Sequence, residues 1–108
     1  MKTVIDVAKD FSPYPAGRYV DDGPYSGEAF REQNLVPALR EGEKVIIQLD
    51  GSEGYGSSFL EEAFGGLVRG GYFSAQELNE LLSIVSDDIA LIDEIRAYIN
   101  SANQKANH

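Results

Sequence analysis

The sequence contains no cysteine, and its only histidine, His108, is the last of its 108 residues. Without cysteine, the chain has no disulfide, no thiolate nucleophile and no cysteine-ligated metal site. A Ser-His-Asp triad or a histidine-based metal site would have to use the end of the chain, so we expect neither. These absences predict a protein that is not an enzyme and that carries no metal and no cofactor.

Basic residues are also scarce. The chain has 9 Lys and Arg against 18 Asp and Glu, which gives a net charge of -9. Surfaces that bind nucleic acids or anionic membranes need clusters of Lys and Arg, so we predict neither partner. No apolar run approaches the length of a membrane span, and residues 1–11 lack the features of a signal peptide. We therefore predict a cytoplasmic protein.

The order of apolar patterns predicts an α/β domain. Short apolar runs typical of strands alternate with helical patterns, with strands expected at 3–7, 45–49 and 81–85 and helices at 26–41, 58–69, 74–79 and 86–100. We predict that Ser26 caps the first helix, that Pro37 kinks or restarts it, that Ser74 and Glu77 form a capping box, and that Ser86 or Asp87 caps the last helix. The alternation of strands and helices favours a small layered domain with a mixed, mostly parallel sheet and helices packed on it. Residues 18–20 add a possible edge strand, which makes about four strands. One domain spans 1–103, and we expect the polar residues 104–108 to fray.

Proline and tyrosine are concentrated in one segment, residues 11–27, which contains three of the four prolines. This composition predicts an irregular conformation, and long irregular segments in compact domains are often functional. Two interpretations remain open for Tyr14, Tyr19 and Tyr25. Their rings either bind a partner or pack over one end of the sheet.

The stretch 44–69 has the most informative pattern in the chain. The apolar run Val45–Leu49 is typical of a central strand that is covered on both faces. Residues Asp50–Gly56 follow, with glycine at three of seven positions. Glycine permits positive φ and close approach of the backbone, so we predict a tight, shaped turn.

A helix follows the turn. Ser58 and Glu61 fit the S-x-x-E pattern of a capping box. Gly65 and Gly66 fall in mid-helix, which predicts close packing against another backbone. An apolar face is formed by residues at helical spacing, while Glu61, Glu62 and Arg69 lie toward the other side; the apolar residues are Phe59, Leu60, Ala63, Phe64, Leu67 and Val68.

A glycine turn before a helix is also a possible anion site, because the free N–H groups and the helix dipole point at it. Residues 54–59 begin like the dinucleotide fingerprint G-x-G-x-x-G, but Phe59 replaces the third glycine. No P-loop is present, since no lysine follows the glycines. A small-ligand or nucleotide-binding domain is therefore the alternative function.

Ser57 and Ser58 have two interpretations as well. One is that they cap the helix, which suits Ser58 best. The other is a phosphoacceptor, because a phosphate on Ser57 would add about two negative charges at the helix start and switch partner binding by charge. A hydrolase that uses Ser57 as its nucleophile lacks an evident base.

The strand, the loop, Ser57-Ser58 and the amphipathic helix resemble the STAS domain of bacterial anti-sigma-factor antagonists. The chain resembles still more closely the STAS-like family of uncharacterised bacterial and phage proteins, in GPYSGEAFRE (23–32) and in GYGSSFLEEAFGGLVR (54–69). In the antagonists, an ATP-binding anti-sigma kinase, which is histidine-kinase-like, phosphorylates the first hydroxyl residue of D-S-[ST]-G. The resemblance therefore implies Ser57 as phosphoacceptor and Ser58 as second hydroxyl. The chain departs from the motif, since Gly56 replaces its Asp and Phe59 its Gly.

The resulting hypothesis is a cytoplasmic, STAS-like protein–protein interaction module, regulated as an anti-sigma-factor antagonist is. The resemblance implies an anti-sigma kinase or related histidine-kinase-like ATPase as partner. The residues expected at the partner or ligand site are those of the turn and the helix start: Asp50, Gly51, Gly54, Tyr55, Gly56, Phe59, Glu61 and Glu62.

Overall fold

Three short strands form one parallel sheet in the order β1-β2-β3: β1 (Thr3–Asp6), β2 (Val45–Gln48) and β3 (Leu82–Val85). The computed structural model describes the backbone of residues 3–106 and the side chains as far as residue 102. The predicted α/β class with a largely parallel sheet is confirmed. The described residues contain three strands rather than about four, because 18–20 do not form one. Instead, the Asp22 carboxylate accepts hydrogen bonds from the N–H groups of Arg18 and Tyr19 and folds this segment back on itself.

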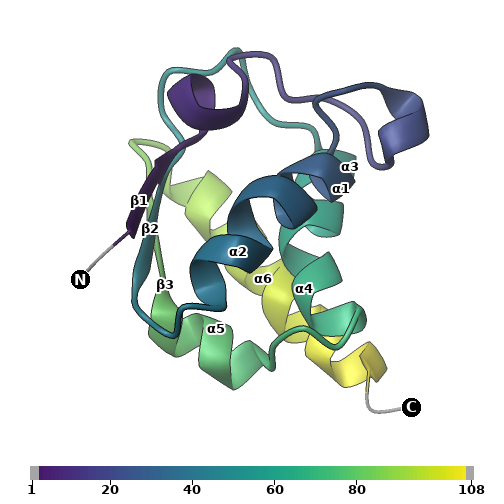
Figure 1. The fold of residues 1–108 in the computed structure, drawn as a ribbon, viewed down its shortest axis with the longest axis vertical. Coiled ribbons are helices and arrows are strands. Elements are labelled where there is room, and N and C mark those ends of the chain that lie inside the picture. Colours follow the sequence, from purple (N-terminus) through teal and green to yellow (C-terminus); the bar gives the residue numbers. More distant parts are fainter. Residues whose placement is uncertain (1–2, 107–108) are drawn as a thin grey trace.

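The helices lie on one side of the sheet (Figure 1). Side chains on the inner face, including Ile5, Ile47 and Leu82, are buried, whereas Val4 on the outer face is 59% exposed and Val85 is 41% exposed. The prediction that β2 is covered on both faces is therefore wrong. The apolar run of β2 reflects one fully buried face and a second face on which Ile46 is only partly buried.

The first long helix is continuous from residue 27 to 39, with a π-helical turn in its middle: α1 (Gly27–Phe30), η3 (Arg31–Leu35) and α2 (Val36–Leu39). As predicted, the Ser26 hydroxyl caps it by accepting from the N–H of Ala29. Pro37 lacks an N–H and cannot continue the α-helical hydrogen bonds. The preceding turn is widened, and the N–H of Val36 bonds to the carbonyl of Arg31.

The second long helix repeats this arrangement from residue 57 to 69: α3 (Ser57–Leu60), η4 (Glu61–Gly65) and α4 (Gly66–Arg69). The predicted packing against another backbone holds for Gly65 but not for Gly66, which faces a side chain. A Cβ on Gly65 would meet the backbone oxygen of Tyr98 at 3.4 Å, and Gly66 faces the Arg31 guanidinium. Gly27 makes a further close approach, because a Cβ there would meet the backbone of Phe59 and Ala63.

The remaining elements are η1 (Val7–Phe11), η2 (Val20–Asp22), α5 (Ala75–Leu81) and α6 (Ile89–Ala106). The predicted capping box Ser74–Glu77 opens α5. The last helix begins later than expected, and Asp88 rather than Ser86 or Asp87 accepts from the N–H of Leu91. Residues 104–106 belong to α6, whereas 107–108 and the prediction of fraying there lie outside the described residues.

The core lies between the sheet and the two long helices, with α6 completing it. Phe30, Phe59 and Phe64 are fully buried there, together with Ile95 and Ile99 of α6. The ring of Phe30 lies 5.9 Å from that of Phe59 and 6.3 Å from that of Phe64. This packing fixes the start of α3 relative to the sheet. Within residues 3–106, no helix has the length and apolar character needed to cross a membrane.

Candidate functional site

The predicted turn joins the carboxyl end of β2 to α3, at the edge where all three parallel strands end. In α/β sheets this edge is the usual place for ligand and partner sites. Gly51 and Gly54 have φ values of 102° and 134°, so the turn needs glycine at both positions. Asp50 fixes the base of the turn, because its carboxylate accepts hydrogen bonds from the Ser86 hydroxyl at 3.0 Å and the Asp87 N–H at 3.2 Å.

Tyr55 and Phe59 hold the turn against the core. The Tyr55 hydroxyl donates to the Leu49 carbonyl at 2.7 Å, and its ring centroid lies 6.0 Å from that of Phe59. Burial raises the pKa of Tyr55, so its hydroxyl stays protonated and keeps this bond at neutral pH. Phe59 is 1% exposed. Both residues therefore support the turn from its core side. The exposed surface of the turn is made by other residues, among them Gly51, Glu53 and Gly54.

The helix starts one residue earlier than predicted. Gly56 is the N-cap, no side chain caps the helix, and Ser57 is the first helical residue. The predicted capping box of Ser58 and Glu61 is wrong, because the Glu61 carboxylate is held by two arginines further along the fold. Ser57 and Ser58 are both exposed at the start of α3, where a partner can reach them.

Ser57 lies beside a short chain of polar groups from α6. Its side chain lies close to that of Tyr98. The Tyr98 hydroxyl in turn donates to the Glu94 carboxylate at 2.6 Å. This hydrogen bond to Glu94, assisted by burial and by the charge of Glu94, raises the pKa of Tyr98. These polar side chains lie where the first turn of α3 meets α6.

Glu61 and Glu62 take part in an ion cluster, which we define as Arg18, Arg31, Arg69, Glu61 and Glu62. The two oxygens of Glu61 accept from Arg18 and from Arg69, each at 2.5 Å. The Glu62 carboxylate accepts from Arg31 at 2.6 Å and from Arg69 at 3.1 Å. Our expectation that both glutamates lie on an outer side of the helix is wrong for Glu62, which is 6% exposed.

The inner pair of this cluster, Arg31 and Glu62, joins the π-helical turns of the two long helices. Arg31 also donates to the backbone carbonyl of Glu62 at 2.9 Å and to the Glu32 carboxylate at 2.9 Å. Burial lowers the pKa of Arg31, but the hydrogen bonds from its guanidinium to Glu62 and Glu32 outweigh burial and raise it overall. The cluster is therefore a structural link between the two long helices.

The sequence analysis did not identify Arg18 and Arg31 as partners of these glutamates. One signal was present. From Phe59 to Val68, only Glu61 and Glu62 are charged or polar, and a helix that is apolar nearly all round is a buried helix. A carboxylate in such a helix needs a cationic partner. Which arginine would supply it cannot be inferred from sequence spacing.

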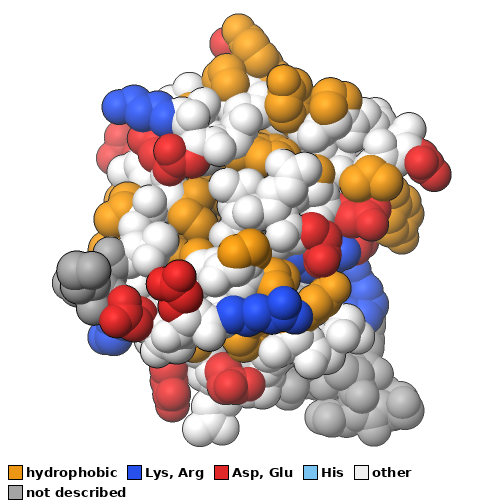
Figure 2. Space-filling model, in the orientation of Figure 1, with side chains coloured by type: hydrophobic (Ala, Val, Ile, Leu, Met, Phe, Trp, Pro, Cys, Tyr) orange, Lys and Arg blue, Asp and Glu red, His pale blue; other side chains and the backbone are white. Residues whose placement is uncertain are grey.

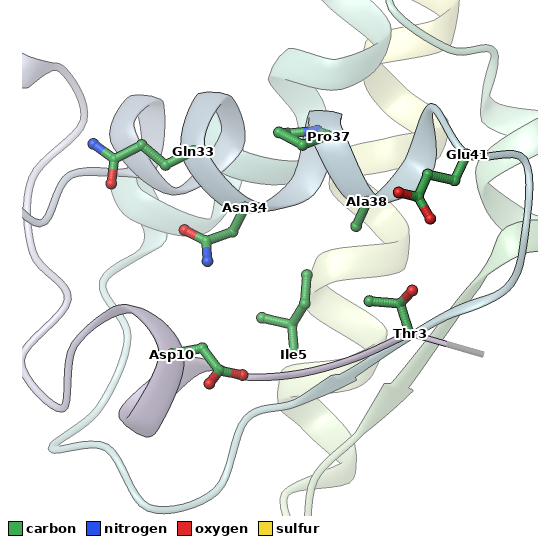
Figure 3. A pocket seen from close by; sticks show the side chains of 8 residues that line it. All are labelled: Thr3, Ile5, Asp10, Gln33, Asn34, Pro37, Ala38 and Glu41. Carbon is green, nitrogen blue, oxygen red and sulfur yellow. The ribbon is translucent and has the colours of Figure 1, made fainter. Parts of the chain in front are cut away.

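A hollow of about 290 Å³ lies apart from the turn, between β1 and the helix 27–39 (Figure 3). Asp10 and Glu41 stand at its two ends, and its other lining residues are Thr3, Ile5, Gln33, Asn34, Pro37 and Ala38. Two carboxylates and no cation in this lining are unfavourable for a phosphate group. Within the described part of the chain, no group of three or more His, Cys, Asp or Glu residues is placed to hold a metal ion.

Comparison with known families matches residues 26–88, from the cap of α1 to the loop before α6, to the STAS-like domain of unknown function (DUF4325). The match covers more than half of the chain. It includes both long helices, β2, β3 and the turn between β2 and α3. Searches of curated proteins and of solved structures gave no match. The strand, turn and helix from β2 to α4 agree with the resemblance noted in the sequence. The chain belongs to the family of STAS-like domains of unknown function.

Proposed function

We propose that this domain is a protein–protein interaction module whose partner contacts the turn Gly51–Ser58. Phosphorylation of Ser57 would switch that contact. The observation that carries the proposal is the state of Ser57, which is exposed at the first position of the helix and is not used as its cap. The backbone fold therefore does not depend on its hydroxyl. Ser58, also exposed, provides a second hydroxyl beside it.

The charges around Ser57 determine whether phosphorylation strengthens or weakens partner binding. A phosphate there adds about -1.5 to -2 charges at neutral pH. Through Tyr98, Ser57 lies near the Glu94 carboxylate, so the added charge increases an existing negative potential. Repulsion between these groups would break the contact with Tyr98 and weaken a partner surface matched to the unmodified turn. As in the antagonists that the chain resembles, the partner would be an ATP-binding, histidine-kinase-like protein, which places the interaction in the cytoplasm.

The same surroundings support a module rather than an enzyme. A serine nucleophile needs a neighbouring base that is deprotonated at working pH. The side chain beside Ser57 is that of Tyr98, whose pKa is raised by its hydrogen bond to Glu94. Its hydroxyl therefore stays protonated and cannot remove a proton from Ser57. We accordingly propose no catalytic residue and no cofactor for this chain.

The test is capture of partners from the native host with four bait proteins, followed by intact mass measurement of each recovered bait. The baits are wild type, Ser57→Ala, Ser57→Asp and Ser101→Asp. The last is a control that makes the same charge change at an exposed serine of α6. We expect a protein that is held by wild type, Ser57→Ala and Ser101→Asp but lost with Ser57→Asp, and a phosphorylated fraction in wild type and Ser101→Asp, the two baits that keep Ser57. Equal capture by all four baits with no phosphate would refute the switch.

A further inference from the structure

Four large apolar or aromatic side chains are exposed on one segment of the chain. Tyr14 is 63% exposed, Tyr19 52%, Val20 55% and Tyr25 44%. We call these four residues the tyrosine surface. Hydrophobic side chains accordingly gather along the upper edge of the molecule, where this segment runs (Figures 1 and 2). An exposed apolar patch of this kind on a small domain usually marks an interaction site.

This surface precedes the part of the chain that matches the family. All four residues precede residue 26, at which the match to the STAS-like family begins. Tyr14 and Tyr19 are more than half exposed, so the interpretation of their rings as a packed cover over the sheet does not fit these two residues.

The segment that carries the tyrosines is held in one conformation by its backbone. The N–H of Ala16 donates to the carbonyl of Tyr25 at 2.9 Å, and the N–H of Gly27 donates to the carbonyl of Gly17 at 2.9 Å. The N–H of Val20 bonds to the Glu28 carboxylate at 3.0 Å. A surface that is already ordered loses little conformational entropy on binding, which favours its use as a docking site.

Side-chain contacts attach the same segment to the rest of the fold. The ring of Tyr25 packs edge-on against Phe11 with centroids 5.8 Å apart, and Arg18 pairs with Glu61 at 2.5 Å. The N–H of Glu53 bonds to the carbonyl of Pro13 at 2.8 Å, so the turn between β2 and α3 lies directly beside the segment. The tyrosine surface therefore adjoins the turn.

The charge of this surface identifies the partner it suits. Arg18 is the single basic residue between residues 10 and 30, and its charge is already paired with Glu61 and Glu62. Asp21 and Glu53 are exposed; Asp21 follows Val20 in the sequence, and the N–H of Glu53 bonds to the carbonyl of Pro13, the neighbour of Tyr14. Guanidinium groups stack on tyrosine rings and pair with carboxylates, and tyrosine is prominent among the residues that dominate interface energy. We propose that the tyrosine surface docks an arginine-containing basic segment of a protein partner.

This inference goes beyond the switch at Ser57 and does not require it. The probes are short labelled peptides in which glycine alternates with arginine, lysine or glutamate, titrated at about 0.15 M salt, where surface charges are screened beyond roughly 8 Å. Fluorescence anisotropy reports binding. We expect the arginine peptide to bind, the lysine peptide to bind several-fold more weakly, and the glutamate peptide not to bind.

Substitutions that leave net charge unchanged separate this surface from general attraction to an acidic protein. The double variant Tyr14→Ser, Tyr19→Ser should weaken the arginine peptide about tenfold, whereas Tyr14→Phe, Tyr19→Phe should keep most of the affinity because the rings remain. Ile89→Ser, at a residue of α6 that is 71% exposed, is the matched control and should bind as wild type does. Thermal melting confirms that each variant is folded.

Two results would overturn the proposal. One is no binding of the arginine peptide to the folded wild type. The other is equal binding to wild type and to the double serine variant, which would show attraction by net charge alone. Ser57→Asp should leave peptide affinity within about twofold, so a failure of the switch is recognised separately from a failure of this surface.

Discussion

Glu61 and Glu62 are neighbours in the sequence, and both contact Arg18 and Arg69. The two glutamates nevertheless occupy different environments. The Glu62 side chain is 8% exposed and its closest partner, Arg31, is 10% exposed. The Glu61 side chain is 20% exposed, and its partners Arg18 and Arg69 are 32% and 37% exposed. The inner pair lies between two packed helices, whereas the outer group reaches solvent.

This difference determines what each ion pair contributes. A buried carboxylate loses its hydration, and only its arginine partner and further hydrogen bonds compensate for that loss. When a partly exposed ion pair forms, its two groups lose contacts with water and gain contacts with each other, so the net gain in stability is small. Removing one member of the inner pair alone is therefore costly, whereas the outer group mainly attaches the segment around Arg18 to the helix 57–69.

The largest expected effect comes from Glu62→Ala, which leaves the Arg31 guanidinium buried without its main counter-charge. We expect the free energy of unfolding to fall by about 3–5 kcal/mol. Urea denaturation followed by circular dichroism measures the change. The double variant Arg31→Met, Glu62→Leu removes both charges and should be clearly more stable than Glu62→Ala. A loss below about 1 kcal/mol for Glu62→Ala would mean that water reaches the inner pair.

Gly27→Ala should have the next largest effect. The added methyl would meet the backbone oxygen of Phe59 and the backbone nitrogen of Ala63, neither of which can turn aside as a side chain can. The two long helices would separate slightly, at a cost of about 1–3 kcal/mol. Thermal unfolding reports the loss. Gly56→Ala, at a position where no atom lies within 4 Å of the added methyl, is the control and should change the stability much less.

Glu61→Ala should cost less than either of these, about 0.5–1 kcal/mol, because water solvates Arg18 and Arg69 once their partner is removed. Urea denaturation under the conditions used for Glu62→Ala allows the two values to be compared directly. If Glu61→Ala were as destabilising as Glu62→Ala, the distinction between an inner and an outer part of the cluster would be wrong.

The smallest effect concerns pH. Burial by itself raises the pKa of Glu61, but the hydrogen bonds from Arg69 and Arg18 outweigh it, so the pKa lies below the ordinary value of 4.5. A lowered folded-state pKa contributes stability that is present above pH 4.5 and is lost as the pH falls through the folded-state value. Wild type should therefore lose stability below pH 4.5 more steeply than Glu61→Gln. Parallel acid titration curves for the two proteins would contradict this.

Features fixed by local chemistry were predictable from the sequence. The Ser26 cap and the Ser74–Glu77 capping box both form as predicted, since each depends on atoms within three residues. The disturbance of the first helix at Pro37 also follows from local geometry, because proline has no N–H to donate. The α/β class follows from the alternation of these local elements.

Features that depend on distant contacts were not predictable. The capping box at Ser58 fails because Arg18, 43 residues away from Glu61, occupies the carboxylate that would have closed it. The outer face of β2 is open because none of the helices within residues 3–106 crosses it (Figure 1), and the sequence of β2 itself does not indicate this. The candidate turn was located correctly as a glycine-rich connection, but its exposed serines and buried aromatic supports became distinguishable only in the fold.

The position of α6 has a consequence for how the chain folds as it leaves the ribosome. Ile95 and Ile99 are fully buried in the core, yet they belong to the last described helix. Until Ile95 and Ile99 emerge from the ribosome, the helix 57–69 lacks the contacts that α6 makes with η4 and α4. The domain therefore cannot complete its core progressively from the N-terminus, and a chaperone that shields apolar surface would act on it until synthesis of α6 is finished.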